Sequence, residues 1–410
     1  MKPESQMMSH GYNPKFSEGA VKPPIFMTST FAFSSAEEGK NYFEVAYGLK
    51  ESDNPKDLGL IYSRMNNPNL EILEDRLCLW DKTDGCAVFE SGMSAISTVF
   101  LGFLKPGDLL LYSMPTYGGT EHLIKTYLKE TGIESIGFLP HHSKEEIIEM
   151  VASSPMAGKL KLIYAETPAN PTNDLIDIAA CRDIARHFSH PGEEPIKVVT
   201  DNTYMGPLWS HPLEHGADLI IYSATKYIGG HSDLIAGAVL GEKSLVNRVK
   251  TLRTFLGNMA SPHTCWLLLR SLETLKVRME QQCLNAGHIA RFLDTHPRVQ
   301  KVYYLGNLEP SSRNYHIYKK QYSSPGAMIS FEIPGGEKEV FKVLNRLKLI
   351  KLAVSLGSTE SLIQHPASMT HAAQSRELKE KIGITEGLIR LSVGVENHED
   401  IINDLYMALK

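Results

Sequence analysis

Short apolar runs alternate with helical segments between about residue 85 and residue 201, and this alternation restricts the fold more than any other feature of the chain. The apolar runs are "CAVFE", "DLLLYSM", "KLIYAET" and "KVVTDN", and segments such as "SGMSAISTVFLGFL", "EHLIKTYLKETG" and "IAACRDIARHF" separate them. Strands joined by helical crossovers run parallel. The pattern therefore predicts an α/β fold with a large, mostly parallel sheet covered on both faces.

The loops at the carboxyl ends of these strands are the expected place for a ligand, because open α/β sheets bind their ligands there. A further apolar run, "ADLIIY", is followed directly by "SATKYIGGHSD". We therefore expect one rim of the sheet to carry the loops "ESGM", "MPTYGGT", "ETPANP", "DNTY" and "SATK".

The chain of 410 residues is too long for one ordinary core, which predicts two or three packed units. Residues 1–66 are rich in Ser, Pro, Gly and aromatic residues and include the loop-like "GLKESDNPKDLG", so we expect an arm there. Residues 67–255 contain the alternating pattern. Residues 256–410 begin with a long helical stretch through "CWLLLRSLETLKVRM" and continue with separated strands such as "AMISFEI", "KLAVSL" and "LIRLSVGV", which predicts a smaller α+β domain.

Composition and charge argue against several classes of function. The net charge is -5 at pH 7 and no long basic run occurs, so a nucleic-acid partner is not expected. No stretch approaches the roughly 18 apolar residues of a membrane span, and the start has no signal-peptide core. The five cysteines contain no C-x-x-C pair, which predicts neither a disulfide framework nor a metal site and favours the reducing cytoplasm.

Lys226 stands where the apolar run "ADLIIY" has just ended, and a charged lysine is costly to bury there. Such a lysine reaches solvent, pairs with an acid, or loses its proton and acts as a nucleophile. Its neighbours favour the last role. Ser223 and Thr225 supply hydroxyl donors, while Gly229 and Gly230 allow the backbone to approach an anionic group beside the amine.

Three further loops supply the groups that an aldehyde cofactor with a phosphate needs. Ser91 and Gly92 open a helix whose free amides can bind a phosphate. Asp201 ends an apolar strand, where its carboxylate can hold a proton on a pyridine nitrogen. Tyr117 can stack on a flat ring. Each residue alone also fits an ordinary structural role, as a turn cap, a core side chain or a common helix start, and only the combination is specific.

Several segments together resemble the transsulfuration (Cys/Met-metabolism) family of pyridoxal-phosphate enzymes. They are "YSRMNNPN", "ESGMSAI", "YGGT", "ETPANP", "DNTY", "SATKYIGGH", "SLGSTESLIQHPASMTH" and "GLIRLSVGVE", and they follow the family's order from about residue 10 to residue 410. The resemblance implies the PLP-dependent transferase fold of type I. It assigns an N-terminal arm to residues 1–66, a PLP-binding domain to residues 67–255 and a C-terminal domain to residues 256–410.

The resemblance also implies the cofactor, pyridoxal 5'-phosphate, and a role for each residue around it. Lys226 would be the Schiff-base lysine and would then act as acid and base. Asp201 would pair with the pyridine nitrogen, and Tyr117 would stack on the ring and assist proton transfer. The ligands of the phosphate from the same subunit would be Ser91, Gly92, Met93, Ser223 and Thr225.

Substrate and subunit contacts are implied in the same way. Arg390 would clamp the carboxylate of an amino-acid substrate, with Asn170 and Ser355 completing that part of the pocket. A surface salt bridge is the ordinary explanation for an arginine, but the setting of Arg390 inside the apolar "LIRLSVGV" favours a ligand-facing role. Tyr62 and Arg64 would reach the phosphate site of the neighbouring subunit. The active unit would therefore be at least a homodimer, and the expected assembly is a homotetramer.

Two positions bear on the member of the family, and they disagree. Methionine γ-lyases typically have a cysteine at the position of Gly119. A glycine there is similar to the cystathionine enzymes. The cystathionine enzymes commonly have an acidic residue at the position of Val354. An uncharged residue there is similar to methionine γ-lyases and sulfhydrylases, and it favours a substrate with an apolar thioether tail. The segment "SLIQHPASMTH" is also more similar to methionine γ-lyase. The resemblance thus favours a methionine γ-lyase-like carbon–sulfur lyase. Cystathionine γ-synthase, cystathionine γ-lyase and O-acylhomoserine sulfhydrylase are the alternatives.

Two departures from the family pattern leave their roles open. Glu90 stands where relatives usually have a small residue, and it would add negative charge beside the phosphate helix only if it pointed inward. The long loop "FEVAYGLKESDNPKDLG" precedes Tyr62 and bears on substrate entry.

Two other classes of protein are weighed against the enzyme. A nucleotide-binding enzyme is disfavoured, because "GAVLGEKS" has Glu242 where a phosphate-binding loop needs glycine. A non-catalytic binding protein of the same fold is disfavoured by the joint presence of Lys226, Asp201, Tyr117 and Arg390.

Overall fold

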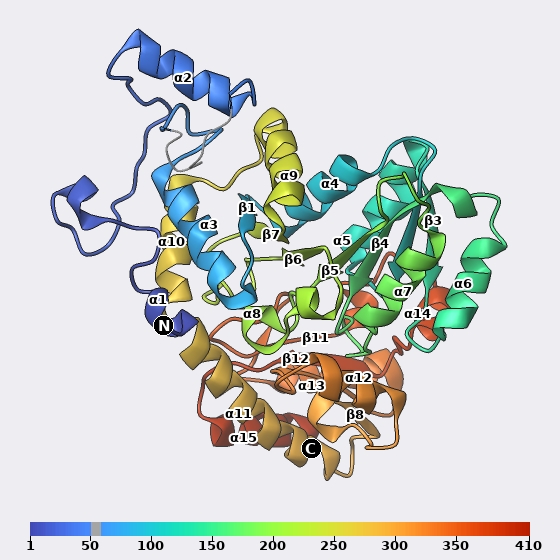
Figure 1. Cartoon of the computed structure of the whole chain (residues 1–410). Coiled ribbons are helices and arrows are strands. Elements are labelled where there is room, and N and C mark those ends of the chain that lie inside the picture. Colours follow the sequence, from blue (N-terminus) through green and yellow to red (C-terminus); the bar gives the residue numbers. More distant parts are fainter. Residues whose placement is uncertain (51–58) are drawn as a thin grey trace.

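A seven-stranded sheet forms the centre of the computed structural model, which describes residues 1–50 and 59–410 (Figure 1). In spatial order the strands are β1 (Gly85–Phe89), β7 (Gly237–Gly241), β6 (Leu219–Tyr222), β5 (Lys197–Asp201), β4 (Leu160–Glu166), β2 (Leu109–Ser113) and β3 (Glu134–Phe138). Only β7 runs antiparallel to its neighbours in this sheet. The mostly parallel sheet predicted from the sequence is confirmed, while β3 and β7 were not anticipated.

Apolar side chains alternate between the two faces of this sheet, as period-two strands require. Leu110 and Tyr112 pack on one face, and Leu109 and Leu111 pack on the other. The first face is covered by α4 (Gly92–Phe103), α5 (Gly118–Leu123), which continues as a π-helical turn, and α9 (Lys243–Leu256). The second face is covered by α6 (Lys144–Ala152) and α7 (Ile178–Phe188). Coverage of both faces explains why the strands are nearly continuous apolar runs.

The C-terminal part of the chain forms a second, smaller sheet, as the separated apolar runs predicted. Its strands lie in the order β10 (Lys351–Leu352), β11 (Leu362–Gln364), β12 (Leu388–Ser392), β9 (Met328–Glu332) and β8 (Lys301–Tyr303). The long helical stretch before it is broken into α10 (Pro262–Leu272) and α11 (Leu275–Asp294). The other helices of this part are α12 (Arg313–Gln321), α13 (Gly336–Arg346), α14 (Arg376–Lys381) and α15 (His398–Leu409).

One continuous hydrophobic cluster joins the two sheets. It includes Val88 and Ile220 of the large sheet, Leu268 of α10 and Ile389 of the small sheet. A shared core of this kind resists separation of the sheets, so the cleft between them keeps its shape. The limits 1–66, 67–255 and 256–410 for the three parts of the chain stay predictions.

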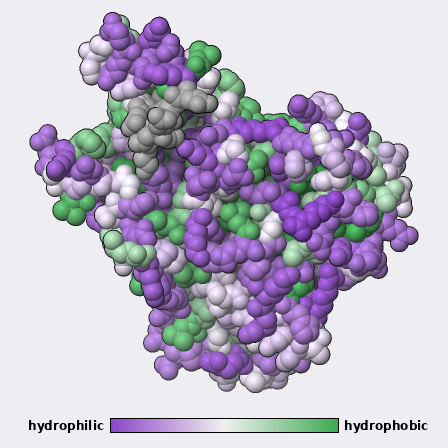
Figure 2. Space-filling view, viewed as in Figure 1, coloured by the Kyte–Doolittle hydropathy of each residue, from purple (hydrophilic) through white to green (hydrophobic). Residues whose placement is uncertain are grey.

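The N-terminal segment is extended and projects from the rest of the molecule (Figure 1). It contains α1 (Pro3–Gln6) and α2 (Ala36–Ala46), and it exposes large apolar side chains such as Phe16 and Val21. The face of the molecule shown in Figure 2 is mostly hydrophilic. The predicted loop "GLKESDNPKDLG" falls largely on residues 51–58, which lie outside the described residues. Within the described residues, no helix combines the length and apolar character needed to cross a membrane.

A buried carboxylate ties α3 (Pro68–Asp81) to the strand that leads into the ligand rim. Glu74 Oε1 accepts from the backbone N–H of Val88 at 3.0 Å and from Arg253 Nη1 of α9 at 2.6 Å. Its other oxygen accepts from Lys250 Nζ at 2.6 Å. Arg253 also donates to the carbonyl of Val88 at 2.7 Å, so one carboxylate and one guanidinium fix β1 just before the helix that opens with Ser91.

We expect the Glu74→Gln variant to lower the free energy of unfolding by roughly 3 kcal/mol, because it leaves the buried Arg253 without its counter-charge. Urea denaturation followed by circular dichroism measures the change. Glu380→Gln is the matched control, because its pair with Arg376 is exposed and should contribute less than about 1 kcal/mol. Equal losses in the two variants would contradict a structural role for the buried pair.

Candidate active site

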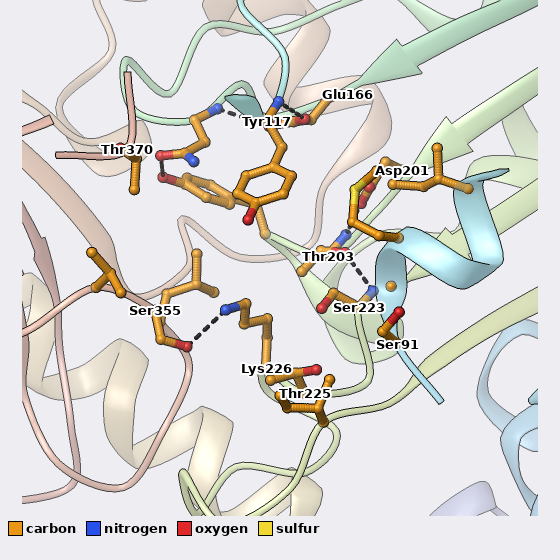
Figure 3. A pocket seen from close by; sticks show the side chains of 18 of the residues that line it. Ser91, Tyr117, Glu166, Asp201, Thr203, Ser223, Thr225, Lys226, Ser355 and Thr370 are labelled. Carbon is orange, nitrogen blue, oxygen red and sulfur yellow. Dashed lines mark hydrogen bonds between the residues drawn. The ribbon is translucent and has the colours of Figure 1, made fainter. Parts of the chain in front are cut away.

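A cavity of about 500 Å³ opens at the carboxyl ends of the large sheet's strands and reaches the loops of the C-terminal part (Figure 3). Loops after β1, β2, β4, β5 and β6 contribute to it, which confirms that the expected rim forms. Eleven of the thirteen predicted cofactor- and substrate-site residues line it: Ser91, Gly92, Met93, Tyr117, Asn170, Asp201, Ser223, Thr225, Lys226, Ser355 and Arg390. Val354, named for its bearing on the substrate, lines it as well.

Lys226 extends into this cavity from the loop after β6, and Figure 3 shows Ser91 and Ser223 on one side of it and Ser355 on the other. Its Nζ donates to Ser355 Oγ at 2.7 Å. Burial, and after it the charge of Arg390, lowers the pKa of Lys226 to about 8. Ser355 has φ of 91°, a conformation that costs energy for any residue with a side chain. The chain thus holds a partly neutral amine against a strained, well-placed hydroxyl.

Asp201 ends β5 as a buried carboxylate with two donors. The backbone N–H of Thr203 donates to Oδ1 at 3.0 Å, and the hydroxyl of Tyr164 donates to Oδ2 at 3.1 Å. Burial raises the pKa of Asp201, and these two hydrogen bonds oppose the rise. The carboxylate is therefore fixed in place and lacks a positive partner among the described residues, although it lines the cavity.

The first turn of α4 forms the end of the cavity suited to an anion. Ser91 caps this helix by accepting from the backbone N–H of Ser94 at 2.9 Å. The helix starts so close to Ser223 that a Cβ added to Gly92 would lie 2.8 Å from the Ser223 Cβ. A helix N-terminus with free amides and a neighbouring hydroxyl is a suitable phosphate site. The hydroxyl of Thr225 is engaged with the backbone of Ala236 and would have to exchange that partner to bind a phosphate.

Tyr117 lies at the start of α5, and its side chain is 45% exposed toward the cavity mouth. The loop after it is closely packed. A Cβ added to Gly119 would lie 2.7 Å from the Tyr117 ring, and one added to Gly118 would lie 2.6 Å from the carbonyl of Thr370. The two glycines therefore set the position of the ring against the 369–374 loop of the C-terminal part.

Arg390 lies in the middle of β12 and is only 2% exposed. Its Nη1 donates to Asn170 Oδ1 at 3.0 Å, and its Nη2 donates to the carbonyl of Ser355 at 2.5 Å. The hydroxyl of Tyr204 donates to the same Asn170 oxygen at 2.9 Å. No carboxylate in the described part of the chain lies within ion-pair distance of this guanidinium, so the cavity contains a buried positive charge with only neutral partners.

The other two predicted site residues, and Glu90, lie elsewhere. Tyr62 and Arg64 do not line the cavity of this chain. Tyr62 is 39% exposed, and Arg64 Nη1 donates to the carbonyl of Thr254 at 2.6 Å. Glu90 is exposed and is not among the residues that line the cavity.

Several cavity residues were missed by the sequence reasoning. Glu166 gave the same signal as Asp201, an acid at the end of an apolar strand, and was overlooked. Tyr204 gave no signal, because a tyrosine after a turn is ordinary. The same holds for Tyr164, which lies in a buried strand outside the cavity lining and donates to Asp201. Ile96 and Thr203 also line the cavity and had been given no role. The others come from distant loops and become neighbours only in the fold: Ile235, Leu356, Met369 and Thr370.

The comparison with protein families decides what this arrangement is. The model for the Cys/Met metabolism PLP-dependent enzymes matches residues 4–410. The chain belongs to this family. It is therefore a PLP-dependent enzyme of transsulfuration, as its sequence motifs predicted.

Individual relatives agree with this assignment. The chain is 40% identical to an L-methionine gamma-lyase of Pseudomonas deceptionensis over 99% of this chain and 96% of that protein. It is 42% identical to an L-methionine gamma-lyase of Porphyromonas gingivalis over 95% of this chain and 93% of that protein. A solved structure of cystathionine gamma synthase from Xanthomonas oryzae, 34% identical, superposes with a TM-score of 0.87 over 100% of this chain and 98% of that one. This structural likeness confirms the type I fold.

The residues of the cavity fit the cofactor of the family. The capped start of α4 and Ser223 offer amide and hydroxyl donors to a phosphate, and Gly92 keeps that end free of a side chain. The fixed carboxylate of Asp201 suits a protonated ring nitrogen, and the amine of Lys226 suits an aldehyde. All three groups line one cavity.

We expect the apoprotein to incorporate pyridoxal 5'-phosphate faster as the pH rises and to reach a plateau above about pH 8. We take the neutral amine of Lys226 as the group that attacks the aldehyde, and its lowered pKa makes that form dominant at a lower pH than for an ordinary lysine. Stopped-flow absorbance of the bound cofactor at a series of pH values measures the rate. Nα-acetyllysine in the same buffers is the control, and its rate should still increase near pH 10. A protein profile that follows this control would show that Lys226 is not perturbed.

Proposed function

We propose that the protein is a cytoplasmic, methionine γ-lyase-like enzyme that converts L-methionine and water into methanethiol, 2-oxobutanoate and ammonia. The family and its cofactor are established above, and the proposal concerns the substrate, the residue roles and the location. The two relatives named L-methionine gamma-lyase support the substrate. The five free cysteines support a reducing compartment.

The lining of the cavity is the observation that carries the choice of substrate. Its charged residues, among those the structure describes, are Glu166, Asp201, Lys226 and Arg390. The rest of the wall toward the C-terminal part is largely apolar and consists of Ile235, Val354, Leu356 and Met369. The two cations serve the amine chemistry and a carboxylate, Asp201 is assigned to the ring nitrogen, and Glu166 accepts hydrogen bonds from three neighbouring donors. Among the described lining residues, no free charged group is left for the distal amine and carboxylate of cystathionine. A thioether tail fits such a wall, because it needs no polar partner.

Arg390 and Asn170 are proposed to hold the substrate carboxylate. A guanidinium can bind a carboxylate through two parallel hydrogen bonds, and the charge of Arg390 is unpaired by any described carboxylate. Its neighbours Asn170 and Tyr204 fix the direction of the guanidinium. The substrate amine would then lie toward Lys226, which is close enough to Arg390 for that charge to lower its pKa.

Lys226 is proposed to carry the protons of the reaction. When bound, pyridoxal 5'-phosphate supplies an aldehyde for the substrate amine and a ring that withdraws electrons from Cα. Lys226, as the neutral amine, accepts the proton from Cα and transfers protons along the substrate chain. Ser355 Oγ, 2.7 Å from Nζ, accepts a hydrogen bond and keeps the amine directed into the cavity. Tyr117 at the mouth is proposed to stack on the ring and to donate a proton to the departing sulfur.

The phosphate end of the cavity supports the proposal of a homodimer as the smallest active unit. Ser91, Ser223 and the α4 amides are neutral, and the two cations of the described cavity wall are assigned to other groups. A phosphate dianion there lacks a positive partner from its own chain. Tyr62 and Arg64 lie outside their own cavity and are proposed to supply this partner to the neighbouring subunit. Two such dimers are proposed to form a tetramer.

We expect purified enzyme with pyridoxal 5'-phosphate to release methanethiol and 2-oxobutanoate from L-methionine with a higher kcat/KM than it shows for L-cystathionine. Gas chromatography and a 2-oxo acid assay measure the products. The same enzyme is offered O-acetyl- and O-succinylhomoserine with cysteine as the comparison for γ-replacement. Formation of cystathionine with the higher kcat/KM would contradict the proposed substrate and favour cystathionine γ-synthase.

Mixing two inactive variants tests the shared site. Lys226→Ala removes the amine from its own cavity, and Arg64→Ala removes the proposed partner contribution. A hybrid dimer contains one cavity with both changes and one with neither. After unfolding and refolding together, equal amounts should recover about a quarter of wild-type activity, because half of the dimers are hybrids with one intact site. The Lys226→Ala variant, unfolded and refolded alone, is the control. Failure to recover activity from two soluble variants would contradict a site shared between subunits.

A further inference from the structure

Glu166 is a buried carboxylate in the cavity wall that none of the roles above uses. It is the last residue of β4 and is 6% exposed. Its backbone N–H donates to Ser113 Oγ at 2.9 Å, which fixes the end of β4 against the end of β2. Its side chain reaches toward Tyr117, and Figure 3 shows the hydrogen bond between the two residues.

Both oxygens of this carboxylate accept hydrogen bonds, and all three donors belong to the loops that form the site. Oε2 accepts from the backbone N–H of Tyr117 at 2.6 Å and from Thr116 Oγ1 at 2.9 Å. Oε1 accepts from the backbone N–H of Asn170 at 3.2 Å. Tyr117 is 49 residues from Glu166 in the sequence, and Asn170 is 4 residues from it. One side chain therefore connects the loop after β2 with the loop that follows its own strand, β4.

The hydrogen-bond donors around Glu166 are suited to the ionised carboxylate, whereas burial and a neighbouring acid favour the protonated form. Its register partner across the sheet is Asp201, and burial followed by this neighbour raises the pKa of Glu166 to about 8. The hydrogen bonds from Tyr117, Thr116 and Asn170 oppose the rise. A protonated carboxyl has one good acceptor fewer, so it would satisfy three donors less well.

We propose that Glu166 is a positioning residue that uses one carboxylate to fix both the stacking tyrosine and the asparagine of the substrate-carboxylate site. The inference rests on the proposed function for the roles of Tyr117 and Asn170. Asn170 transmits the effect to the substrate, because its Oδ1 accepts from Arg390 at 3.0 Å. A shift of the Asn170 backbone therefore changes the direction of the guanidinium that binds the carboxylate.

A glutamine at this position separates the positioning role from a simple loss of bulk. The Glu166→Gln side chain has one acceptor oxygen and one donor NH₂. With its oxygen toward Tyr117 and Thr116 it retains two hydrogen bonds and places the NH₂ against the N–H of Asn170. Two donors then face each other, so we expect the variant to retain cofactor binding and to lose the fixed position of Asn170.

Ligand pairs that differ only by a carboxylate measure this effect without turnover. L-Norleucine has the size of methionine and no sulfur leaving group, and pentylamine is the same molecule without the carboxylate. Titration of the bound cofactor's absorbance gives Kd for each. We expect Glu166→Gln to raise Kd for L-norleucine about tenfold while the Kd for pentylamine changes less than about twofold. With L-methionine, KM should rise more than kcat falls.

Two further variants make the test specific. Glu166→Asp keeps two acceptor oxygens and should restore part of the preference for L-norleucine. Asp404→Asn is the structural control, because Asp404 is also a buried carboxylate that accepts from the backbone N–H groups of Lys348, Leu349 and Ile350 and does not line the cavity. It should lower thermal stability without changing the ratio of the two Kd values.

The outcomes distinguish this inference from the proposed function. If Glu166→Gln had wild-type Kd values, or if it bound both ligands more weakly by the same factor, the positioning role would be overturned. A wild-type enzyme that prefers L-norleucine to pentylamine but releases no methanethiol from methionine would overturn the proposed substrate and leave the role of Glu166 intact. A wild-type enzyme with no preference for the carboxylate would overturn the role of Arg390 and, with it, the route through Asn170.

Discussion

The in-register parallel pairing of β4 with β5 is the constraint on which the rest of the site depends. It places Glu166 opposite Asp201 at the last residues of both strands. The loops that follow, with Asn170 after one strand and Thr203 after the other, therefore start at the same edge of the sheet. Tyr164, two residues before Glu166 on β4, reaches across to hold Asp201. One strand pair thus fixes the carboxylate that is proposed to face the cofactor ring and the carboxylate that joins the loops around it.

Burial shifts the pKa values of the acids and of the amine of this site in opposite directions. It raises the pKa of Glu166 and Asp201 and lowers the pKa of Lys226, because each charged form loses its hydration. The site therefore contains charges that are costly without a ligand. A protonated ring nitrogen is complementary to the acids, and the carboxylate of a substrate is complementary to the guanidinium of Arg390. The chain keeps this arrangement because a hydrophobic core shared by both sheets stabilises it.

The alternating apolar pattern was enough to predict the large sheet, its rim and the strand-end residues Lys226 and Asp201. It missed β3, because "ESIGF" is only partly buried at an edge, and β7, because the glycine-rich "GAVLG" is short and pairs antiparallel. Within the site, Asn170 and Arg390 are 220 residues apart, and no local pattern relates them. Their pairing came from family resemblance alone. The position of Glu166, an acid at the end of a buried strand, could be recognised in the sequence. The three groups that donate hydrogen bonds to it are identified only by the three-dimensional structure.

The partners of Arg390 explain how a buried guanidinium can stay available to a ligand. Asn170 Oδ1 and the carbonyl of Ser355 accept its hydrogen bonds, and the amide oxygen of Gln364, turned toward the guanidinium, accepts at 3.0 Å. These oxygens satisfy and orient the donors without neutralising the charge. A carboxylate of the protein in the same place would compete with the substrate for both hydrogen bonds and charge. Neutral acceptors, among them Asn170 with its contacts to Tyr204 and Glu166, therefore leave the positive charge available for the proposed carboxylate ligand.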